Sequence, residues 1–253
     1  MLVLSLFPGI GLLDMAFELE SFCVVRGPDV LWGGDIRAFH PPAGKFDGVI
    51  GGPPCQAFSS MAHLVRRNGH EPRFGNLIPE FERCVAEAKP AWFLAENVRA
   101  APEPAVNGYG TKSFLLDNCW LAGEGGFGQE QMRLRRFTFG TRGREAPDLR
   151  RWIDMAVFLL PDALQHEAVT GGNDRPPSAR AAVNRSITGS NGGASVRMTR
   201  YTLADACRLQ GLPPDFLADA PFTAAGKLKA VANGVAIPTG RAVAKAIKEA
   251  TRS

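Results

Sequence analysis

The chain has 253 residues, 45% of them hydrophobic and 21% charged, which is enough apolar material for one sizeable core and unlike a disordered chain. The net charge of +4 and the pI of about 8.9 permit an anionic partner such as nucleic acid without requiring one. The sequence has no apolar run of the ~20 residues that span a bilayer, and its N-terminus looks like a strand rather than a signal peptide. The five cysteines are odd in number, which argues against a complete disulfide framework, and they show no C-x-x-C spacing or zinc motif, so a reducing, intracellular setting fits best.

Predicted elements alternate between strand and helix along the first half of the chain. Strand patterns cover residues 2–7, 23–25, 46–50, 92–95 and 136–141, and helical spacing covers 12–19 and 78–88. This alternation predicts a doubly wound, Rossmann-like α/β sheet. From about residue 146 to 198 the pattern gives way to polar and glycine-rich loops, and helical patterns return over 203–209 and 240–251.

A stiff loop around Cys55 is the most informative local feature. Gly51, Gly52, Pro53 and Pro54 precede the cysteine and end the apolar run before it. Pro54 fixes the backbone beside the thiol, which suits a nucleophile held in one geometry, at the edge where open α/β sheets carry reactive groups. The alternative is a small buried cysteine with a packing role, and the loop alone does not decide between the two.

Small or acidic residues follow three other predicted elements. Gly9 and Gly11 let a cofactor approach the backbone, although an ordinary tight turn has the same residues and the third glycine of a dinucleotide fingerprint is missing. Asp35 either caps a local turn or binds a cofactor adenine. Glu96 and Asn97 end a buried strand, where the carboxyl group of Glu96 is either solvated or has its pKa raised by an apolar pocket, so that it can donate a proton.

Arginines dominate the stretch that begins at Gln131. Arg133 and Arg135 alternate with it at period two, so on one strand the three side chains share a face, either as an exposed edge or as a cationic wall. Further arginines follow at Arg136, Arg142, Arg144, Arg150 and Arg151. A charge run is usually a solvated surface, but arginine is the better bidentate partner for phosphate.

The order of these motifs resembles the cytosine-C5 DNA methyltransferase family along most of the chain. The matching segments are residues 7–11, 34–36, 53–56, 75–77, 96–98, 131–135, 208–211 and 233–235. The cysteine loop, the Glu-Asn-Val and the Gln-x-Arg-x-Arg segments are together the specific ones. The resemblance implies an α/β, S-adenosylmethionine-dependent methyltransferase fold. It also implies a catalytic domain over residues 1–140, a small target-recognition region over 141–198 and a C-terminal segment over 199–253 that returns to the catalytic domain.

The resemblance further implies an activity. Members of this family transfer a methyl group from S-adenosylmethionine to C5 of a cytosine flipped out of double-stranded DNA, leaving S-adenosylhomocysteine. The thiolate of Cys55 would add to C6 of the base, and Glu96 would protonate N3 with support from Asn97. Arg133 and Arg135 would hold the base carbonyl, Glu96 and a nearby phosphate.

Binding residues also follow from the resemblance. Those implied for the cofactor are Phe7, Gly9, Ile10, Gly11, Asp35, Ile36, Pro54, Leu77, Asn233 and Val235. Those implied for nucleic acid are Gln56, Ser59, Arg66, Arg67, Arg73 and Gln131, where the arginines would neutralise phosphates. We expect a monomer without metal in the cytoplasm of a bacterial or phage-infected cell.

Two departures from the family pattern carry expectations of their own. The connection from the second strand to Gly34 is short enough to lack a helix, and Asp29 is the candidate for the acid that binds the cofactor ribose. Residues 141–198 leave room only for a minimal DNA-reading region, which predicts modest sequence specificity. Two alternatives remain open: an RNA cytosine-C5 methyltransferase, since one branch of the family acts on transfer RNA, and a catalytically silent nucleic-acid-binding protein.

Overall fold

The computed structural model describes residues 1–54, 58, 75–161, 164–167 and 201–252. The chain divides into two compact units. Unit 1 comprises Met1–Leu116, Leu134–Ile153 and Val243–Ser253, and unit 2 comprises Asp117–Arg133 and Asp154–Ala242. No helix in the described ranges is both long and apolar enough to cross a membrane.

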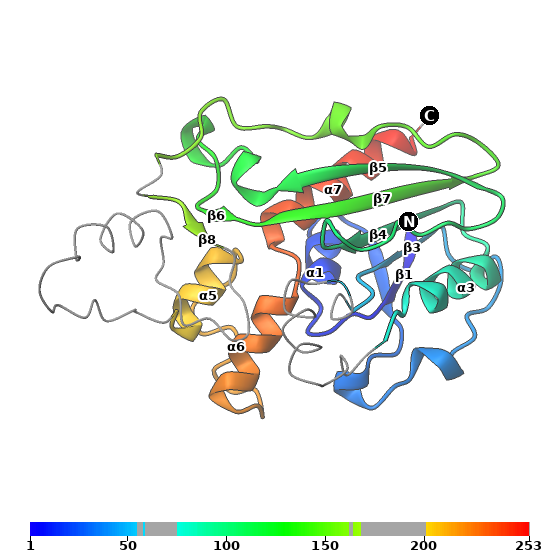
Figure 1. Ribbon diagram of the computed structural model, residues 1–253, viewed down its shortest axis with the longest axis horizontal. Helices are drawn as coiled ribbons and strands as arrows, with labels where there is room; N and C mark the ends of the chain where they lie inside the picture. Colours follow the sequence, from blue (N-terminus) through cyan, green and yellow to red (C-terminus); the bar gives the residue numbers. More distant parts are fainter. Residues whose placement is uncertain (55–57, 59–74, 162–163, 168–200, 253) are drawn as a thin grey trace, which may run out of the picture. The chain divides into compact units, whose positions relative to one another are not determined.

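Unit 1 is built on a six-stranded sheet in the order β2-β1-β3-β4-β7-β5 (Figure 1). Its strands are β1 (Leu2–Leu6), β2 (Cys23–Arg26), β3 (Gly48–Gly51), β4 (Trp92–Asn97), β5 (Tyr109–Asp117) and β7 (Leu134–Arg142). The first four run parallel, and β7 is antiparallel to β4. Parallel strands covered on both faces are apolar throughout, which explains why Val3, Leu4, Val49 and Ile50 are at most 1% exposed.

Helices cover both faces of this sheet. On one face, α3 (Ile78–Ala88) buries Phe81 and Val85 at helical spacing, and the Phe81 ring lies 5.9 Å from that of Phe93 on β4. On the other, α1 (Leu12–Leu19) reaches β1 through a hydrogen bond from Ser5 Oγ to Asp14. The doubly wound arrangement predicted by the strand–helix alternation is therefore confirmed.

The connection between β2 and β3 contains no α-helix, as its length predicted. Two 3-10 turns, η1 (Val30–Trp32) and η2 (Ile36–Ala38), take its place. Asp29 and Asp35 cap them by accepting hydrogen bonds from the backbone N–H groups of Leu31 and Arg37. The capping alternative for Asp35 is thus observed, and Asp29 also accepts a hydrogen bond from the Gly9 N–H just after β1.

Unit 2 pairs two short strands and carries helices. Strand β6 (Gln131–Met132) runs parallel to β8 (His166–Glu167), and the helices are α5 (Leu203–Leu209), α6 (Ala224–Asn233) and the first residues of α7 (Ile237–Ala250). The prediction that Gln131, Arg133 and Arg135 share one strand face is wrong, because β6 ends at Met132 and β7 begins at Leu134 in another sheet. Arg133 lies between the two strands, and its backbone N–H donates a hydrogen bond to the side-chain Oδ1 of Asp117 at 2.5 Å.

Candidate active site

The loop after β1 is shaped by two residues from the β2–β3 connection. Phe7, Gly9 and Gly11 have positive φ angles of 57°, 56° and 82°. The two glycines adopt such values without strain. The Gly9 N–H donates to Asp29 Oδ2 at 2.9 Å, and Trp32 Nε1 donates to the Gly9 carbonyl at 2.8 Å. Asp29 and Trp32 therefore fix both backbone groups of Gly9. A Cβ built on Gly9 would meet no atom within 4 Å, so the loop borders open space.

Strand β2 ends at Arg26, close to where the family resemblance implies an acidic residue that binds the cofactor ribose. Arg26 Nε donates to Asp14 Oδ2 at 2.9 Å, and its guanidinium lies so close to Gly11 that a Cβ there would be 2.9 Å from Nη2. Asp14 is fully buried, and burial raises its pKa, against the lowering by hydrogen bonds from Ser5 and Arg26. Arg26 therefore cannot supply an acid at this position. Asp29 does supply a carboxylate, which accepts a hydrogen bond from the backbone of the loop after β1.

A helix on the opposite face holds the second turn in place. Arg83 on α3 donates from Nη2 to the carbonyls of Ile36 and Phe39 at 2.8 and 3.0 Å. Ile36 and Leu77 are 3% and 5% exposed and belong to the core under α3. Bonds from a side chain to distant carbonyls leave no pattern in a sequence, so the positions of Arg83 and Trp32 could not have been predicted.

Glu96 at the end of β4 forms an ion pair with Arg135 on β7. Arg135 Nε lies 3.0 Å from Glu96 Oε1, and the two side chains are 19% and 12% exposed. Arg135 also donates from Nη1 to the Leu134 carbonyl at 2.8 Å. A Cβ on Gly52 would stand 3.2 Å from Glu96 Oε2, so glycine there leaves the carboxylate its room. Two of the predicted catalytic side chains thus meet at the carboxyl edge of the sheet.

Asn97 ties this edge to the cysteine loop. Its Nδ2 donates to the Pro53 carbonyl at 3.1 Å, and its Oδ1 accepts from the Val98 N–H at 2.9 Å. Asn97 is 8% exposed, so both halves of its amide are used in a buried setting. The chain therefore enters the Pro54–Cys55 step from an anchored Pro53.

Arg133 lies in unit 2, and its hydrogen bonds go to the backbone at the end of α6. It is 4% exposed and donates from Nη2 to the carbonyls of Ala232 and Gly234 at 2.8 and 2.9 Å. Gln210 Nε2 adds bonds to the carbonyls of Val231 and Gly234 at 3.0 and 3.3 Å. Both side chains thus donate to carbonyls at the C-terminal end of a helix, directly beside Asn233 and Val235, and the Val231 carbonyl also accepts the Gly234 N–H.

Several predicted residues lie outside the described residues: Cys55, Gln56, Ser59, Arg66, Arg67 and Arg73. Gln131 is described and is 1% exposed. Within the described ranges, no group of His, Cys, Asp and Glu side chains is arranged to hold a metal ion.

Comparison with known proteins gives a consistent result. The family model described as C-5 cytosine-specific DNA methylase matches residues 33–112. The type II methyltransferase M.FnuDI of Fusobacterium nucleatum is 36% identical over 115 residues, which are 39% of this chain and 33% of that protein. For M.NgoPII of Neisseria gonorrhoeae the identity is 30% over 167 residues, or 56% of this chain and 48% of that protein. The chain thus spans a third to a half of these curated relatives.

Solved structures share the fold over nearly the whole chain. A DNMT2 mutant from Spodoptera frugiperda superposes with a TM-score of 0.65 at 14% identity, covering 98% of this chain and 99% of that one. A putative DNA modification methyltransferase of an E. coli prophage gives a TM-score of 0.61 at 18% identity, with full coverage of both chains. The predicted Rossmann-like α/β class is confirmed. In sequence, residues 33–112 are similar to the C-5 cytosine-specific DNA methylases, and the chain is similar over part of its length to the two type II methyltransferases.

Proposed function

We propose that the chain is a DNA cytosine-C5 methyltransferase that uses S-adenosylmethionine. The observation that carries the proposal is the carboxyl edge of unit 1, where Glu96 pairs with Arg135 and Asn97 anchors Pro53, two residues before Cys55. A thiol, a carboxyl group and a guanidinium are the groups that nucleophilic attack on a pyrimidine ring needs. The names of the curated relatives, type II methyltransferases, agree with it.

Cys55, Glu96 and Arg135 each have a defined step in the proposed reaction. The Cys55 thiolate forms a bond to C6, and the displaced electron pair moves through C5 toward N3, where a proton delivered through Glu96 neutralises it. The pair would return through C5 to form the new C5–methyl bond, while the bond from the methyl group to the sulfur of S-adenosylmethionine would break and leave its electron pair on sulfur. Loss of the C5 proton to a base then restores the C5=C6 bond and releases the thiolate. Arg135 stabilises the charge that builds on the ring and its carbonyl.

The loop after β1 fits the cofactor. Gly9 borders open space, and Asp29 and Trp32 hold its backbone. When bound there, S-adenosylmethionine supplies an electrophilic methyl group. Asp29 accepts one backbone hydrogen bond on each oxygen and retains capacity for a ribose hydroxyl, since a carboxylate accepts up to about four. The remaining residues proposed for the cofactor are Phe7, Ile10, Gly11, Asp35, Ile36, Pro54, Leu77, Asn233 and Val235.

The proposed substrate is double-stranded DNA, bound by a monomer in the cytoplasm of a bacterial or phage-infected cell. Contacts to DNA are proposed for Gln56, Ser59, Gln131 and the arginines at positions 66, 67 and 73. An RNA substrate is the second candidate, because DNMT2 proteins from Spodoptera frugiperda and S. pombe share the fold.

A single assay separates these candidates. The purified chain is incubated with radiolabelled S-adenosylmethionine and either duplex DNA or transfer RNA, and methylated cytosines are mapped by bisulfite sequencing. The proposal expects labelled DNA, and modest specificity expects several short sequence contexts. Label on transfer RNA alone would replace the DNA proposal with the RNA candidate, and binding without label on either would leave a silent binding protein.

The nucleophile has its own control. Cys55→Ala is expected to abolish transfer, whereas Cys23→Ala is expected to retain it, because Cys23 is an exposed cysteine on β2 with no role in the proposed reaction. Transfer by Cys55→Ala at the rate of the unmodified chain would rule out the covalent mechanism.

A further inference from the structure

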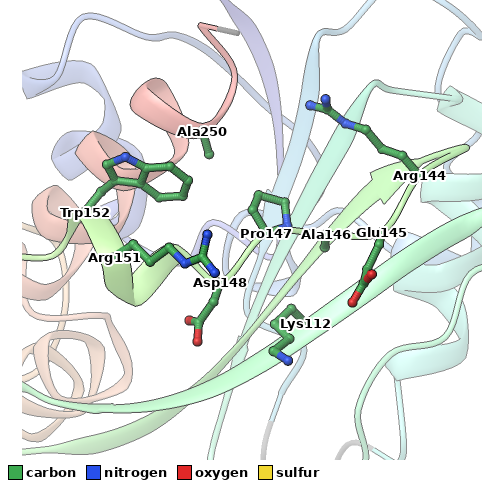
Figure 2. A pocket seen from close by; sticks show the side chains of 9 residues that line it. All are labelled: Lys112, Arg144, Glu145, Ala146, Pro147, Asp148, Arg151, Trp152 and Ala250. Carbon is green, nitrogen blue, oxygen red and sulfur yellow. The ribbon is translucent and has the colours of Figure 1, made fainter.

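A pocket in the described part of unit 1 is lined by residues away from the carboxyl edge of the sheet. Its volume is about 390 Å³, within the usual range for small-molecule sites. Lys112 on β5, the turn after β7, the turn η6 (Leu149–Trp152) and Ala250 line it. Figure 2 shows Trp152 and Arg151 on one side of Pro147, Arg144 and Glu145 on the other, and Lys112 below. We call it the β5–β7 pocket.

Strand register separates this pocket from the proposed active site. On β7, Arg136 is opposite Asn97, and Thr141 is opposite Trp92 at the start of β4. The stretch of β7 from Arg136 to Arg142 therefore covers about 20 Å at the usual rise of about 3.4 Å per residue. Apart from Lys112 on β5 and Ala250, the lining residues follow Arg142 in the chain, and neither Glu96 nor Arg135 is among them.

Three cations of the described chain line this pocket without an ion pair at contact distance, although Lys112 is close enough to Asp148 to help lower the pKa of that carboxylate. Lys112, Arg144 and Arg151 line it, and among the described residues no ion pair or side-chain hydrogen bond engages them. Asp148, in contrast, is neutralised by Arg150, whose Nε and Nη2 lie 3.0 and 2.6 Å from its two oxygens. The remaining carboxylate is Glu145, so positive charge predominates.

The pocket also has a rigid frame and an aromatic wall. The Arg144 carbonyl accepts a bond from Thr141 Oγ1 at 3.1 Å, and Asp148 caps η6 through the Arg150 N–H. Trp152, 36% exposed, closes one side. A planar apolar surface next to unpaired guanidinium groups suits a ligand that has an aromatic ring and an anionic group.

We propose that the β5–β7 pocket binds the phosphate of a nucleotide, with the base against Trp152. Lys112, Arg144 and Arg151 supply the donors, because guanidinium groups match phosphate oxygens in a bidentate geometry. The ligand is either a free nucleotide or one nucleotide of a strand, since both present the same chemistry. This site is independent of the proposed methyl transfer, because it contains no residue assigned to that reaction.

The test follows the indole N–H signal of Trp152 in ¹H–¹⁵N spectra, assigned by its loss in Trp152→Phe. Thymidine 5′-monophosphate is expected to shift this signal saturably, and thymidine alone to leave it unmoved. A short thymidine oligonucleotide is the second arm: tighter binding than the mononucleotide identifies a nucleic-acid strand, and equal or weaker binding identifies the free nucleotide. An unmoved signal with both phosphate ligands, or an equal shift with thymidine, would overturn the proposal.

Variants separate specific binding from general attraction. Arg144→Gln/Arg151→Gln is expected to weaken mononucleotide binding at least about tenfold, as the loss of charge-assisted hydrogen bonds requires. The control Lys45→Gln/Lys229→Gln makes the same change in net charge at exposed positions outside the pocket and is expected to leave affinity within about twofold. Equal losses in the two double variants would reduce the effect to overall charge and contradict a built site.

Discussion

Glu96 and Arg135 meet because of strand register and not because of closeness in sequence. The antiparallel ladder places Phe137 opposite Glu96, so Arg135 is the diagonal neighbour on the same face, within reach of a long side chain. Both groups are largely buried, at 12% and 19% exposure. Burying either charge costs free energy, and the opposite charge of the partner offsets part of that cost.

Arg135→Met tests this pair. The change leaves a largely buried carboxylate without its guanidinium and is expected to lower the free energy of unfolding by about 3 kcal/mol and methyl transfer by more than about 100-fold. Urea unfolding and a labelled-methyl assay measure the two. Arg135→Lys keeps the charge and should recover part of both losses. The control Arg142→Met, on the exposed end of the same strand, should change neither by much, and wild-type transfer by Arg135→Met would remove the pair from the mechanism.

The buried cysteines have thiol pKa values too high for a nucleophile at neutral pH. Burial raises the pKa of Cys84 to about 11 and that of Cys119 to about 12, so at neutral pH only about one thiol in ten thousand or fewer is a thiolate. In a Cys23→Ser chain, iodoacetamide at neutral pH is therefore expected to modify Cys55 and to spare Cys84 and Cys119. Peptide mass spectrometry reads the sites, and rapid labelling of Cys84 in the folded chain would contradict the prediction.

At the scale of elements, the end of α6 shows how a motif can serve structure. Arg133 and Gln210 donate to the carbonyls of Val231, Ala232 and Gly234. A cation at a helix C-terminus also complements the helix dipole. Arg133 of the Gln-x-Arg-x-Arg segment and Gln210 of the Arg-Leu-Gln-Gly segment thus meet in unit 2 around the loop that carries Asn233 and Val235.

Arg133→Met distinguishes anchoring from a direct catalytic role. Loss of the bonds to the buried Ala232 carbonyl and the partly buried Gly234 carbonyl is expected to lower the free energy of unfolding by about 2 kcal/mol and to speed amide hydrogen exchange over residues 231–235. If Arg133 positions the proposed cofactor residues, KM for S-adenosylmethionine should rise about tenfold or more with a smaller change in kcat. Gln210→Leu should give the same pattern more weakly. A fall in kcat at constant KM would instead assign Arg133 to the reacting base.

Local patterns predicted most elements but not the way in which they meet. The bounds of α1, α3 and α5 match their expected ranges, because apolar spacing and helix ends are local signals. Helix α6 was missed: it has Gly226 in its interior, and glycine weakens a helical signal. Glu96 and Asn97 could be placed at a strand end from the sequence. The pairing with Arg135 and the division of Gln131, Arg133 and Arg135 between two sheets depend on long-range strand order, which residue spacing does not encode.

The free energy of unfolding of the whole molecule combines carboxylates with opposite pH behaviour. Burial raises the pKa of Asp14 above its ordinary value of 3.8. Burial also acts to raise the pKa of Glu87, but hydrogen bonds from Arg83 and His40 outweigh it, so that this pKa lies below 4.5. Asp14 therefore binds its proton more tightly in the folded state, and Glu87 binds its proton less tightly.

The two signs can be separated by Asp14→Asn and Glu87→Gln. The stability that protonated Asp14 contributes is fully present below its unfolded pKa and is lost as pH rises through the folded one, by about 1.4 kcal/mol for each pH unit that separates the folded pKa from the unfolded pKa. The wild-type advantage over Asp14→Asn should thus shrink from about pH 4 to about pH 7. Glu87 contributes fully above its unfolded pKa of 4.5 and loses that contribution as pH falls through its lower folded pKa, so the wild-type advantage over Glu87→Gln should grow as pH rises toward about 5 and then stay constant. Urea unfolding followed by circular dichroism measures both differences. If the wild-type advantage over Asp14→Asn instead grew with pH, as is expected for Glu87→Gln, burial would not be raising the pKa of Asp14. The Ser5–Asp14–Arg26 contacts would then act as an ordinary solvated ion pair at the start of the proposed cofactor loop.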